Sequence, residues 1–422
     1  MKVLVIGSGG REHTLIWKIK KSPLVDKVYC APGNAGIAQI AECIPLAVSD
    51  LSGLLDFACT KSIDLTVVGP ELPLTLGIVD EFNRNGLKIF GVNKKSAQLE
   101  GSKVFMKELM SKYRIPTAGF RVFTDAQLAK DYVRQKGMPL VVKADGLAAG
   151  KGVVVCRKEA EARQAIDEIM ERRVFGAAGD KLIIEDCLAG EEVSFLAFTD
   201  GKTVLPMVSA QDHKAIFDGD NGPNTGGMGA YSPAPLVDDN LYHKIMERVM
   251  LPTVKALAAE GYDYRGVLYA GLMIIGGEPY VLEFNARFGD PETQVIVPRL
   301  ASDIVPVFQA VIEGKLAEIE LNWRTEAAVC VVLAAGGYPG KYGKGDLIGG
   351  WDKFDNSGDL LLFHAGTANR EGGIVSAGGR VLGITALHHD LKQAIASTYT
   401  GIEKIQFKDM YYRKDIGHRA IR

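Results

Sequence analysis

Short apolar runs that end in glycine or proline turns constrain the fold of the first hundred residues more than any other feature. Residues 3–6 form a β-rich run that enters a glycine turn at 7–10, and apolar residues at helical spacing follow over 15–19. Strand, glycine turn and helix in this order begin an open α/β sheet. Similar runs, each followed by a turn, occupy residues 28–30, 65–68 and 89–91. We therefore predict a doubly wound parallel α/β domain over residues 1–102, with its glycine loops at the strand ends where such sheets bind ligands.

The rest of the chain has the pattern of an α+β protein with more than one unit. Residues 140–144 and 153–155 predict two strands joined by a glycine-rich flap. A hairpin over 271–284 has Gly276-Gly277 at its turn, and the last hundred residues are again rich in β-type runs and turns. We place a central domain at 103–322, with a flap lobe at about 118–188, and a β-rich C-terminal domain at 323–422.

Composition and charge exclude several classes of function. At 422 residues the chain is too long for one ordinary core and predicts two to four domains. Its net charge is −2, so nothing indicates a basic surface for nucleic acid. The six cysteines form no CxxC pair and no zinc-like cluster, which is typical of a reducing compartment. The first residues have too short an apolar core for a signal peptide, and no run is long enough to span a membrane, so we expect a cytoplasmic protein.

The second strand of the predicted hairpin carries a row of polar side chains. Because successive side chains of a strand point to opposite faces, Glu283, Asn285 and Arg287 share one face. A carboxylate and an amide oxygen are ligands that Mg²⁺ prefers, and an arginine beside them would stabilise developing negative charge. The pattern alone fits equally well a strand edge with solvated polar residues. We assign the other face to the core, namely Leu282, Phe284 and Ala286.

The glycine-rich segment 146–152, which follows Lys143, is the second feature. It differs from a P-loop, because its spacing is wrong, no Ser or Thr follows Lys151, and a strand follows instead of a helix. A glycine loop between two strands can still close over a triphosphate, with Lys143 neutralising phosphate oxygens. The alternative is an ordinary glycine hairpin with solvated lysines. We favour the nucleotide interpretation, because two lysines flank a loop of small residues.

Three further motifs carry weaker signals. The turn 7–10 lacks the third glycine of the dinucleotide fingerprint, since Glu12 stands there, so it favours a phosphate at a helix N-terminus over NAD. The strand 182–185 runs into a segment whose backbone could pair with an adenine edge, and an acid shortly after it could hold ribose hydroxyls or simply face solvent. His213 is a candidate general base, but histidines are more often structural, and its role is open.

Taken together, four motifs resemble the glycinamide ribonucleotide synthetase family of the ATP-grasp superfamily. They lie at residues 7–13, 211–235, 283–294 and 413–420, and the resemblance covers essentially the whole chain. The resemblance implies a central ATP-grasp domain that holds ATP between two lobes. It also implies a ligase that joins glycine to 5-phosphoribosylamine through a glycyl phosphate, giving glycinamide ribonucleotide, ADP and phosphate in de novo purine biosynthesis.

The resemblance also implies roles for single residues. Glu283 and Asn285 would bind Mg²⁺ (or Mn²⁺) on the ATP phosphates, and Arg287 and Lys143 would be catalytic. ATP would contact Lys103, Lys143, Gly150, Lys151, Gly152, Glu185, Asp186, Cys187, Leu188 and Glu192. The other substrates would contact Gly9, Gly10, Glu12, Asn34, Glu71, Asp212, Lys214, Gly289 and Asp290. We expect only small-molecule partners, namely ATP, glycine and 5-phosphoribosylamine, and a monomer or weak dimer.

The chain departs from the family pattern at two places. Ala215 follows the Asp-His-Lys triplet where related enzymes commonly carry arginine, which puts a guanidinium role there in doubt. The hinge reads Glu-Asp-Cys-Leu where Glu-Glu-Phe-Leu is more usual, but backbone pairing to adenine survives that change. The other interpretations are a sister ATP-grasp carboxylase or formyltransferase, a silent nucleotide sensor and a nicotinamide dehydrogenase. The segment 222–227 and the C-terminal tail favour the synthetase.

Overall fold

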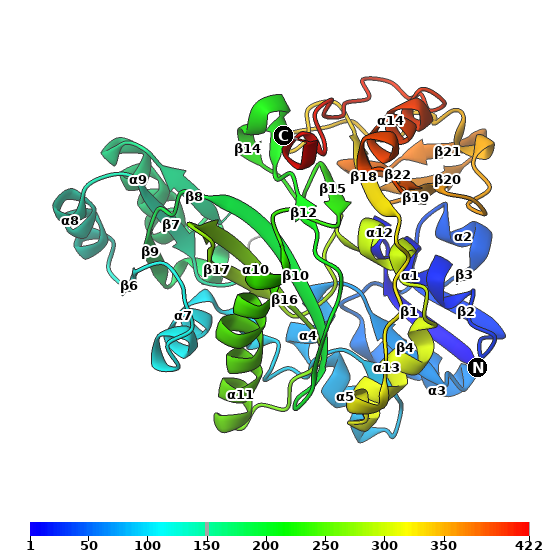
Figure 1. Ribbon diagram of the computed structural model, residues 1–422, viewed down its shortest axis with the longest axis horizontal. Helices are drawn as coiled ribbons and strands as arrows, with labels where there is room; N and C mark the ends of the chain where they lie inside the picture. Colours follow the sequence, from blue (N-terminus) through cyan, green and yellow to red (C-terminus); the bar gives the residue numbers. More distant parts are fainter. Residues whose placement is uncertain (148–151, 422) are drawn as a thin grey trace.

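Residues 1–147 and 152–421 are described in the computed structural model, and the predicted parallel domain at the N-terminus is confirmed (Figure 1). Its sheet has the order β3-β2-β1-β4-β5, with every neighbouring pair parallel. Strand β1 is buried after its first residue because it lies inside the sheet and its alternating side chains pack into a hydrophobic core on each face. The elements are β1 (Lys2–Gly7), α1 (Gly10–Ile19), β2 (Lys27–Pro32), α2 (Ile37–Ile40), β3 (Glu42–Cys43), α3 (Leu51–Lys61), β4 (Leu65–Val68), α4 (Glu71–Leu76), α5 (Ile78–Arg84) and β5 (Ile89–Phe90).

A four-stranded antiparallel sheet of order β6-β9-β7-β8 forms the flap lobe. The two strands predicted around the glycine loop are confirmed as β7 and β8, which pair with each other. The helix after them is α9, which is extended by a π-helical turn at Asp167–Glu171. The elements from the first linker onward are α6 (Gln98–Gly101), α7 (Lys103–Lys112), β6 (Phe120–Phe123), α8 (Ala126–Lys136), β7 (Leu140–Ala144), β8 (Val153–Cys156), α9 (Glu159–Ile166) and β9 (Leu182–Asp186).

The second sheet of the central region is antiparallel, with the order β11-β10-β16-β17 (green in Figure 1). The predicted hairpin is confirmed as β16 and β17, and both glycines of its turn have positive φ, 58° at Gly276 and 76° at Gly277, which glycine adopts without steric cost. The elements are β10 (Glu191–Asp200), β11 (Val204–Pro206), α10 (Asp239–Ile245), α11 (Leu251–Ala259), β16 (Arg265–Ile275), β17 (Glu278–Asn285), α12 (Thr293–Ile296) and α13 (Ile304–Glu313).

The alternation of side chains along β17 is broken at Leu282. The pairing with β16 shifts register there, so Leu282 lies in a bulge between Val281 and Glu283. A bulge inserts one extra residue, so Val281 and Phe284 both reach the core and Leu282 is partly exposed, as Glu283 is. The prediction of Leu282 on the core face is therefore wrong, whereas Phe284 and Ala286 are buried as predicted.

Four phenylalanine rings join the N-terminal domain to the central sheet. Phe90 of β5 lies 4.2 Å, between ring centroids, from Phe308 of α13 and 6.3 Å from Phe198 of β10. Phe288, the residue after Arg287, packs into this group at 5.8 Å from Phe198. Because buried aromatic contacts of this kind are directional, the cluster fixes the chain directly behind the polar face of β17.

The C-terminal sheet has the order β12-β15-β18-β22-β19 and takes two strands from the predicted central domain. The boundary near residue 322 stays a prediction, because this sheet crosses it. The elements are β12 (Gln211–Asp212), β13 (Ala215–Phe217), β14 (Asn221–Asn224), β15 (Gly229–Ser232), β18 (Ala327–Ala334), β19 (Leu360–His364), β20 (Thr367–Arg370), β21 (Gly373–Ser376), β22 (Arg380–His388) and α14 (Leu391–Ile402). Over residues 1–147 and 152–421, every helix is too short or too polar to cross a membrane.

A buried arginine ties the C-terminal tail to the β13–β14 hairpin. Arg413 is fully buried, and its Nε and Nη2 each donate to a carboxylate oxygen of Asp415 at 2.7 Å. Its Nη1 donates to Oδ1 of Asp220 at 2.9 Å and to the carbonyl oxygen of Ala215 at 3.1 Å. Since a buried charge is costly unless it is paired, the tail packs here only with this network complete. The network thereby fixes the chain that follows the Asp-His-Lys triplet.

Replacement of this guanidinium should destabilise the fold. We expect Arg413→Met to lower the free energy of unfolding by about 3 kcal/mol, because it removes the guanidinium that pairs with Asp415 and leaves Asp220 with Arg419 alone. Urea unfolding followed by far-UV circular dichroism measures this difference. The exposed Arg134→Met on α8 is the matched control and should change stability by less than about 0.5 kcal/mol. Equal midpoints for the two variants would contradict the role assigned to Arg413.

Candidate active site

The polar face of β17 is the centre of the candidate active site. Lys214, just before β13, lies between two carboxylates, with its Nζ 2.8 Å from Oε2 of Glu192 on β10 and 3.9 Å from Oε1 of Glu283 on β17. The structure therefore brings together the predicted ribose carboxylate, a predicted substrate lysine and a predicted metal ligand, although they are far apart in the sequence.

Four cations surround the carboxylate of Glu283. Burial raises the pKa of this group, but Lys214, Lys143, Lys103 and Arg287 together outweigh burial and hold the pKa below its ordinary value. The carboxylate is thus held in its ionised form by cations from four different parts of the chain. These lysines and the arginine are groups that can also bind phosphate oxygens.

Glu283 and Asn285 supply two hard oxygen ligands side by side. In the described part of the chain no group of three or more His, Cys, Asp or Glu side chains could hold a metal. Oδ1 of Asn285 accepts a hydrogen bond of 3.2 Å from Nη2 of Arg287. The two side chains fit a divalent cation that takes its other ligands from phosphate oxygens and water, as Mg²⁺ does at nucleotide sites.

Arg287 is held by two acids from the N-terminal region. Its Nη2 lies 2.9 Å from Oε1 of Glu100, and its Nε lies 3.4 Å from Oε2 of Glu71. Burial lowers the pKa of the guanidinium, but Glu100 and Glu71 raise it above its ordinary value. Glu71 was predicted and Glu100 was missed, because Glu100 lies on the short helix α6 outside every recognisable motif. The guanidinium is fixed and charged beside the predicted metal ligands.

Lys143 of β7 connects the flap lobe to β17. Its Nζ lies 3.0 Å from Oε2 of Glu185 and donates to the carbonyl oxygen of Leu282 at 3.1 Å. Lys107 of α7, which the sequence analysis missed, shares the same Oε2 at 2.9 Å. The other carboxylate oxygen of Glu185 is buried and has no hydrogen-bond partner within the described residues. A buried acceptor without a partner indicates that a donor group of a ligand binds this oxygen.

The predicted adenine hinge, residues 185–188, begins in the last two residues of β9 and continues beyond the strand. Within the described residues no hydrogen bond reaches the backbone of Cys187 or Leu188, which leaves these groups available to a base edge. The side chain of Asp186 is half-exposed and pairs with Lys136 at 2.9 Å, away from Lys143. Lys103 donates to the carbonyl oxygen of Gly146 at 2.8 Å, at the start of the glycine loop. Gly150 and Lys151 lie outside the described residues, whereas Gly152 accepts from the backbone N–H of Ala144 at 2.9 Å.

Glu12 occupies the first glycine loop with its side chain. Its Oε2 accepts a hydrogen bond of 2.6 Å from the backbone N–H of Gly9. A Cβ atom at Gly69 would lie 2.0 Å from Oε1 of Glu12, and one at Gly7 would lie 2.4 Å from its Cγ, so these glycines are needed to make room for the carboxylate. In a dinucleotide fingerprint the glycines leave space for the pyrophosphate to approach the backbone, but here the side chain of Glu12 fills that space. This geometry argues against a nicotinamide dehydrogenase.

Asn34 is engaged within the protein. Its Nδ2 donates to the carbonyl oxygens of Ser8 and His364, at 2.8 Å each, and its Oδ1 accepts from the N–H groups of Gly36 and Ile37. Both donor positions and both acceptor positions of the side-chain amide are therefore used. A contribution of Asn34 to substrate binding stays a prediction, and in this arrangement it would act by shaping the loop.

The turn after β17 meets the N-terminal glycine loop at Asp290. A Cβ atom at Gly9 would lie 3.1 Å from Oδ2 of Asp290, and Gln294 donates to Oδ1 of Asp290 at 2.9 Å. Arg380 of β22, which the sequence analysis missed, lies 3.3 Å from Asp290 and donates to the carbonyl oxygen of Gly226 at 2.7 Å. Its only sequence signal was an arginine at the start of a strand. Arg380 therefore places a guanidinium at the predicted substrate cavity. Ala215, at the position where related enzymes commonly carry arginine, supplies none.

Asp212 lies in a cluster of acids behind Lys214. Burial is the main cause that raises the pKa of Asp212 to about 7, and Glu292, Glu192 and Glu283 add to it, while Lys214 opposes it. Glu292 is buried, and its Oε1 accepts from the Ser194 hydroxyl at 3.0 Å. A cluster with more negative than positive side chains favours a cationic group of a ligand.

His213 is no general base in this structure. It is fully buried, and its Nε2 accepts from the backbone N–H of Gly417 at 3.4 Å. Burial, followed by Arg419 and Arg413, lowers the pKa of His213 to about 3, so the ring stays neutral. Its role is to join the C-terminal tail to the segment that carries Asp212.

The raised pKa of Asp212 predicts a pH-dependent stability. Between the unfolded value of 3.8 and about 7, the folded protein keeps a proton that the unfolded chain has lost. The contribution to stability is therefore full below 3.8 and is lost as the pH rises to 7. We expect neutral Asp212→Asn to equal wild type near pH 4 and to gain stability over it by up to about 4 kcal/mol at pH 8.

Urea unfolding at pH 4.5, 5.5, 6.5 and 7.5 measures this trend. The exposed Asp56→Asn on α3 is the control and should show a constant difference from wild type at all four values. A constant difference for Asp212→Asn as well would contradict the shift.

Comparison with known families matches the three regions of the chain in order. Residues 1–100 match the N domain of phosphoribosylglycinamide synthetase, residues 101–293 match its ATP-grasp (A) domain, and residues 328–419 match its C domain. The family models together span most of the chain.

Curated relatives and a solved structure agree with these matches. Phosphoribosylamine–glycine ligases of Caldanaerobacter subterraneus subsp. tengcongensis and Vibrio vulnificus are each 51% identical to this chain, over 99% and 100% of it and 99% of their own lengths. The crystal structure of phosphoribosylamine–glycine ligase from Thermotoga maritima is 34% identical, with a TM-score of 0.86 over 99% of this chain and 100% of its own. Biotin carboxylase of Campylobacter jejuni, 15% identical with a TM-score of 0.74 over 97% of this chain and 92% of its own, shares the fold.

The geometry of the β17 face, the three matched domains and the full-length relatives lead to the same conclusion. The chain belongs to the phosphoribosylglycinamide synthetase family of ATP-grasp ligases.

Proposed function

We propose that this protein joins glycine to 5-phosphoribosylamine at the expense of ATP, giving glycinamide ribonucleotide, ADP and phosphate in de novo purine biosynthesis. The observation that carries the proposal is the ionised carboxylate of Glu283 among four cations from different parts of the chain. Relatives of nearly equal length carry the name of this ligase, which supports the same reaction. We further propose that the protein acts as a cytoplasmic monomer or weak dimer, which size-exclusion chromatography with light scattering tests.

ATP would lie between the flap lobe and the sheet that contains β17. Lys103 and Lys143 would contact its phosphates, and the loop with Gly150, Lys151 and Gly152 would cover them. The backbone of Glu185, Asp186, Cys187 and Leu188 would pair with adenine, and Glu192 would bind the ribose. Mg²⁺ or Mn²⁺ held by Glu283 and Asn285 would neutralise charge on the phosphates.

The two other substrates would meet at Arg287. We assign 5-phosphoribosylamine to the cavity between the N-terminal loops and the turn after β17, with Arg380 near its phosphate. The ammonium group of glycine suits the acid cluster around Asp212, and its carboxylate would point to Arg287 and Lys214. The residues of the amine cavity are Gly9, Gly10, Glu12, Asn34, Glu71, Gly289 and Asp290.

The chemistry needs positioning and charge neutralisation more than acid–base groups. An oxygen of the glycine carboxylate attacks the γ-phosphorus of ATP, ADP leaves, and glycyl phosphate forms. The amine of 5-phosphoribosylamine then attacks the carbonyl carbon and loses a proton, and phosphate leaves. Arg287 stabilises the negative charge of both the acyl phosphate and the tetrahedral intermediate. A protein nucleophile has no part in these steps, so the cysteines have none either.

Loss of the charged metal ligand should abolish turnover. We expect Glu283→Gln to lower kcat at least about 1,000-fold with the fold intact, because an amide cannot replace the carboxylate in charge. Glycine-dependent ADP release, with 5-phosphoribosylamine generated in the assay, measures the rate. The exposed Glu108→Gln on α7 is the control and should retain full activity. Near-normal rates for Glu283→Gln at saturating Mg²⁺ would overturn the metal assignment.

The guanidinium of Arg287 should act mainly on the rate. We expect Arg287→Lys to lower kcat by about 100-fold and to change the KM for ATP much less, because an ammonium cannot reproduce the planar fork between Glu71 and Glu100. Steady-state kinetics with ATP as the varied substrate separates the two parameters. An effect confined to the KM for ATP would place Arg287 at the nucleotide instead of the acyl group.

A further inference from the structure

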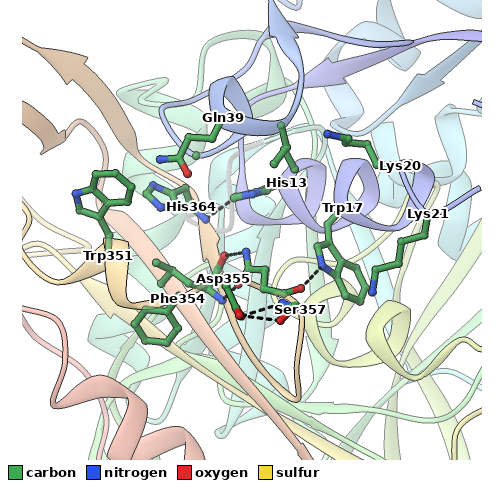
Figure 2. A pocket seen from close by; sticks show the side chains of 14 residues that line it. His13, Trp17, Lys20, Lys21, Gln39, Trp351, Phe354, Asp355, Ser357 and His364 are labelled. Carbon is green, nitrogen blue, oxygen red and sulfur yellow. Dashed lines mark hydrogen bonds between the residues drawn. The ribbon is translucent and has the colours of Figure 1, made fainter. Parts of the chain in front are cut away.

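A second hollow lies on the side of α1 that faces the C-terminal domain. It is a cavity of about 300 Å³ between α1, α2, β19 and the segment 351–357 (Figure 2). Helix α1 directs Arg11 and Glu12 toward the candidate active site, whereas His13, Trp17, Lys20 and Lys21 line this cavity at helical spacing. The two sites are therefore on different faces of one helix, and the proposed ligation uses none of these four side chains.

One end of the cavity is aromatic. Trp351 and Phe354 line it and are partly exposed, and Trp17 lies on the opposite wall. Two of the three tryptophans of the chain thus line one small cavity. The indole N–H of Trp17 donates to the carbonyl oxygen of Asn356 at 3.1 Å, which holds the ring in place. Partly exposed aromatic rings in a concave site are typical of surfaces that bind a planar ligand.

The middle of the cavity is lined by two neutral imidazoles. Nδ1 of His13 accepts a hydrogen bond of 2.8 Å from the backbone N–H of His364, so the proton of His13 is on Nε2. Nδ1 of His364 is paired with the hydroxyl of Thr367 at 3.1 Å. Among the described residues no hydrogen bond reaches Nε2 of either ring. Both side chains can therefore offer a polar atom to a ligand.

The other end of the cavity is cationic. Lys20 and Lys21 are exposed at its rim, on the side away from Trp351 and Phe354 (Figure 2). The acid of this rim, Asp355, is satisfied by its own loop, since the N–H and the hydroxyl of Ser357 donate to its carboxylate at 3.0 and 2.7 Å. Lys20 and Lys21 outnumber the still-charged Asp355, so the lining of the cavity carries a net positive charge, which suits an anionic group.

We propose that this cavity binds a purine nucleoside monophosphate, with the base against Trp351 and Phe354 and the phosphate at Lys20 and Lys21. The size of the cavity, with an aromatic end, hydrogen-bonding side chains in the middle and a cationic end, matches the order of base, sugar and phosphate in such a molecule. Its occupant contacts α1, whose first turn carries Arg11 and Glu12, so the cavity is connected to the amine site through one rigid element.

Calorimetric titration with GMP tests the proposal on the full-length protein. Saturating Mg²⁺ with a non-hydrolysable ATP analogue fills the nucleotide cleft, and saturating ribose 5-phosphate competes for the amine cavity. Under these conditions we expect GMP to bind at one site per chain. Under the same conditions guanosine, which lacks the phosphate, should bind this site at least 10-fold more weakly than GMP.

Variants at the two ends locate the binding. Trp351→Ala and the double variant Lys20→Ala/Lys21→Ala should each weaken GMP binding at least 10-fold and leave glycine-dependent ADP release unchanged. The exposed Lys255→Ala on α11 is the matched control and should bind GMP as wild type does. Absence of GMP binding with the cleft filled, or binding that is equal in all these variants, would overturn the proposal. Equal binding of guanosine and GMP would overturn the role of the lysines.

Discussion

Compensation of buried charge along the polar face of β17 is the interaction on which the rest of the site depends. Glu283 is ionised because lysines from the flap lobe, α7 and the segment before β13 converge on it together with Arg287. Arg287 in turn is charged and fixed because Glu71 and Glu100 of the N-terminal region reach it. Each of these groups would be costly to bury alone. The observed packing of the domains pairs all of them and brings them together at the polar face of β17.

Two contacts outside the candidate active site hold this arrangement of the domains in place. The phenylalanine cluster around Phe288 joins β5, β10 and α13 directly behind Arg287. At the other end, Arg413 and His213 join the C-terminal tail to the strand that carries Asp212. Neither contact takes part in the proposed chemistry. Their effect is positional, and phosphoryl transfer depends on position more than on any acid or base.

Side chains of helix α1 face two different parts of the molecule. Its first turn holds Glu12 against the N-terminal glycine loop, while the next residue, His13, already faces the C-terminal domain. Neighbouring residues of a helix point about 100° apart. The side chains of this one short helix can therefore line two separate surfaces. Side chains on both faces of α1 form hydrogen bonds with other domains, so a shift of α1 would displace the side chains on both faces.

The sequence by itself determined the parallel N-terminal sheet, the β7–β8 pair, the β16–β17 hairpin and the polar residues of β17. These features depend on local periodicity and turn chemistry, which are visible within a few residues. Tertiary structure alone decided the bulge at Leu282, the buried acids Glu100 and Glu292 beside the site, the guanidinium of Arg380 and the neutral state of His213. It also decided that Asn34 is used within its own loop. The reason is that pairing, burial and charge depend on contacts with other parts of the chain, 204 residues apart for His213 and Gly417, and no local pattern records which of them will meet.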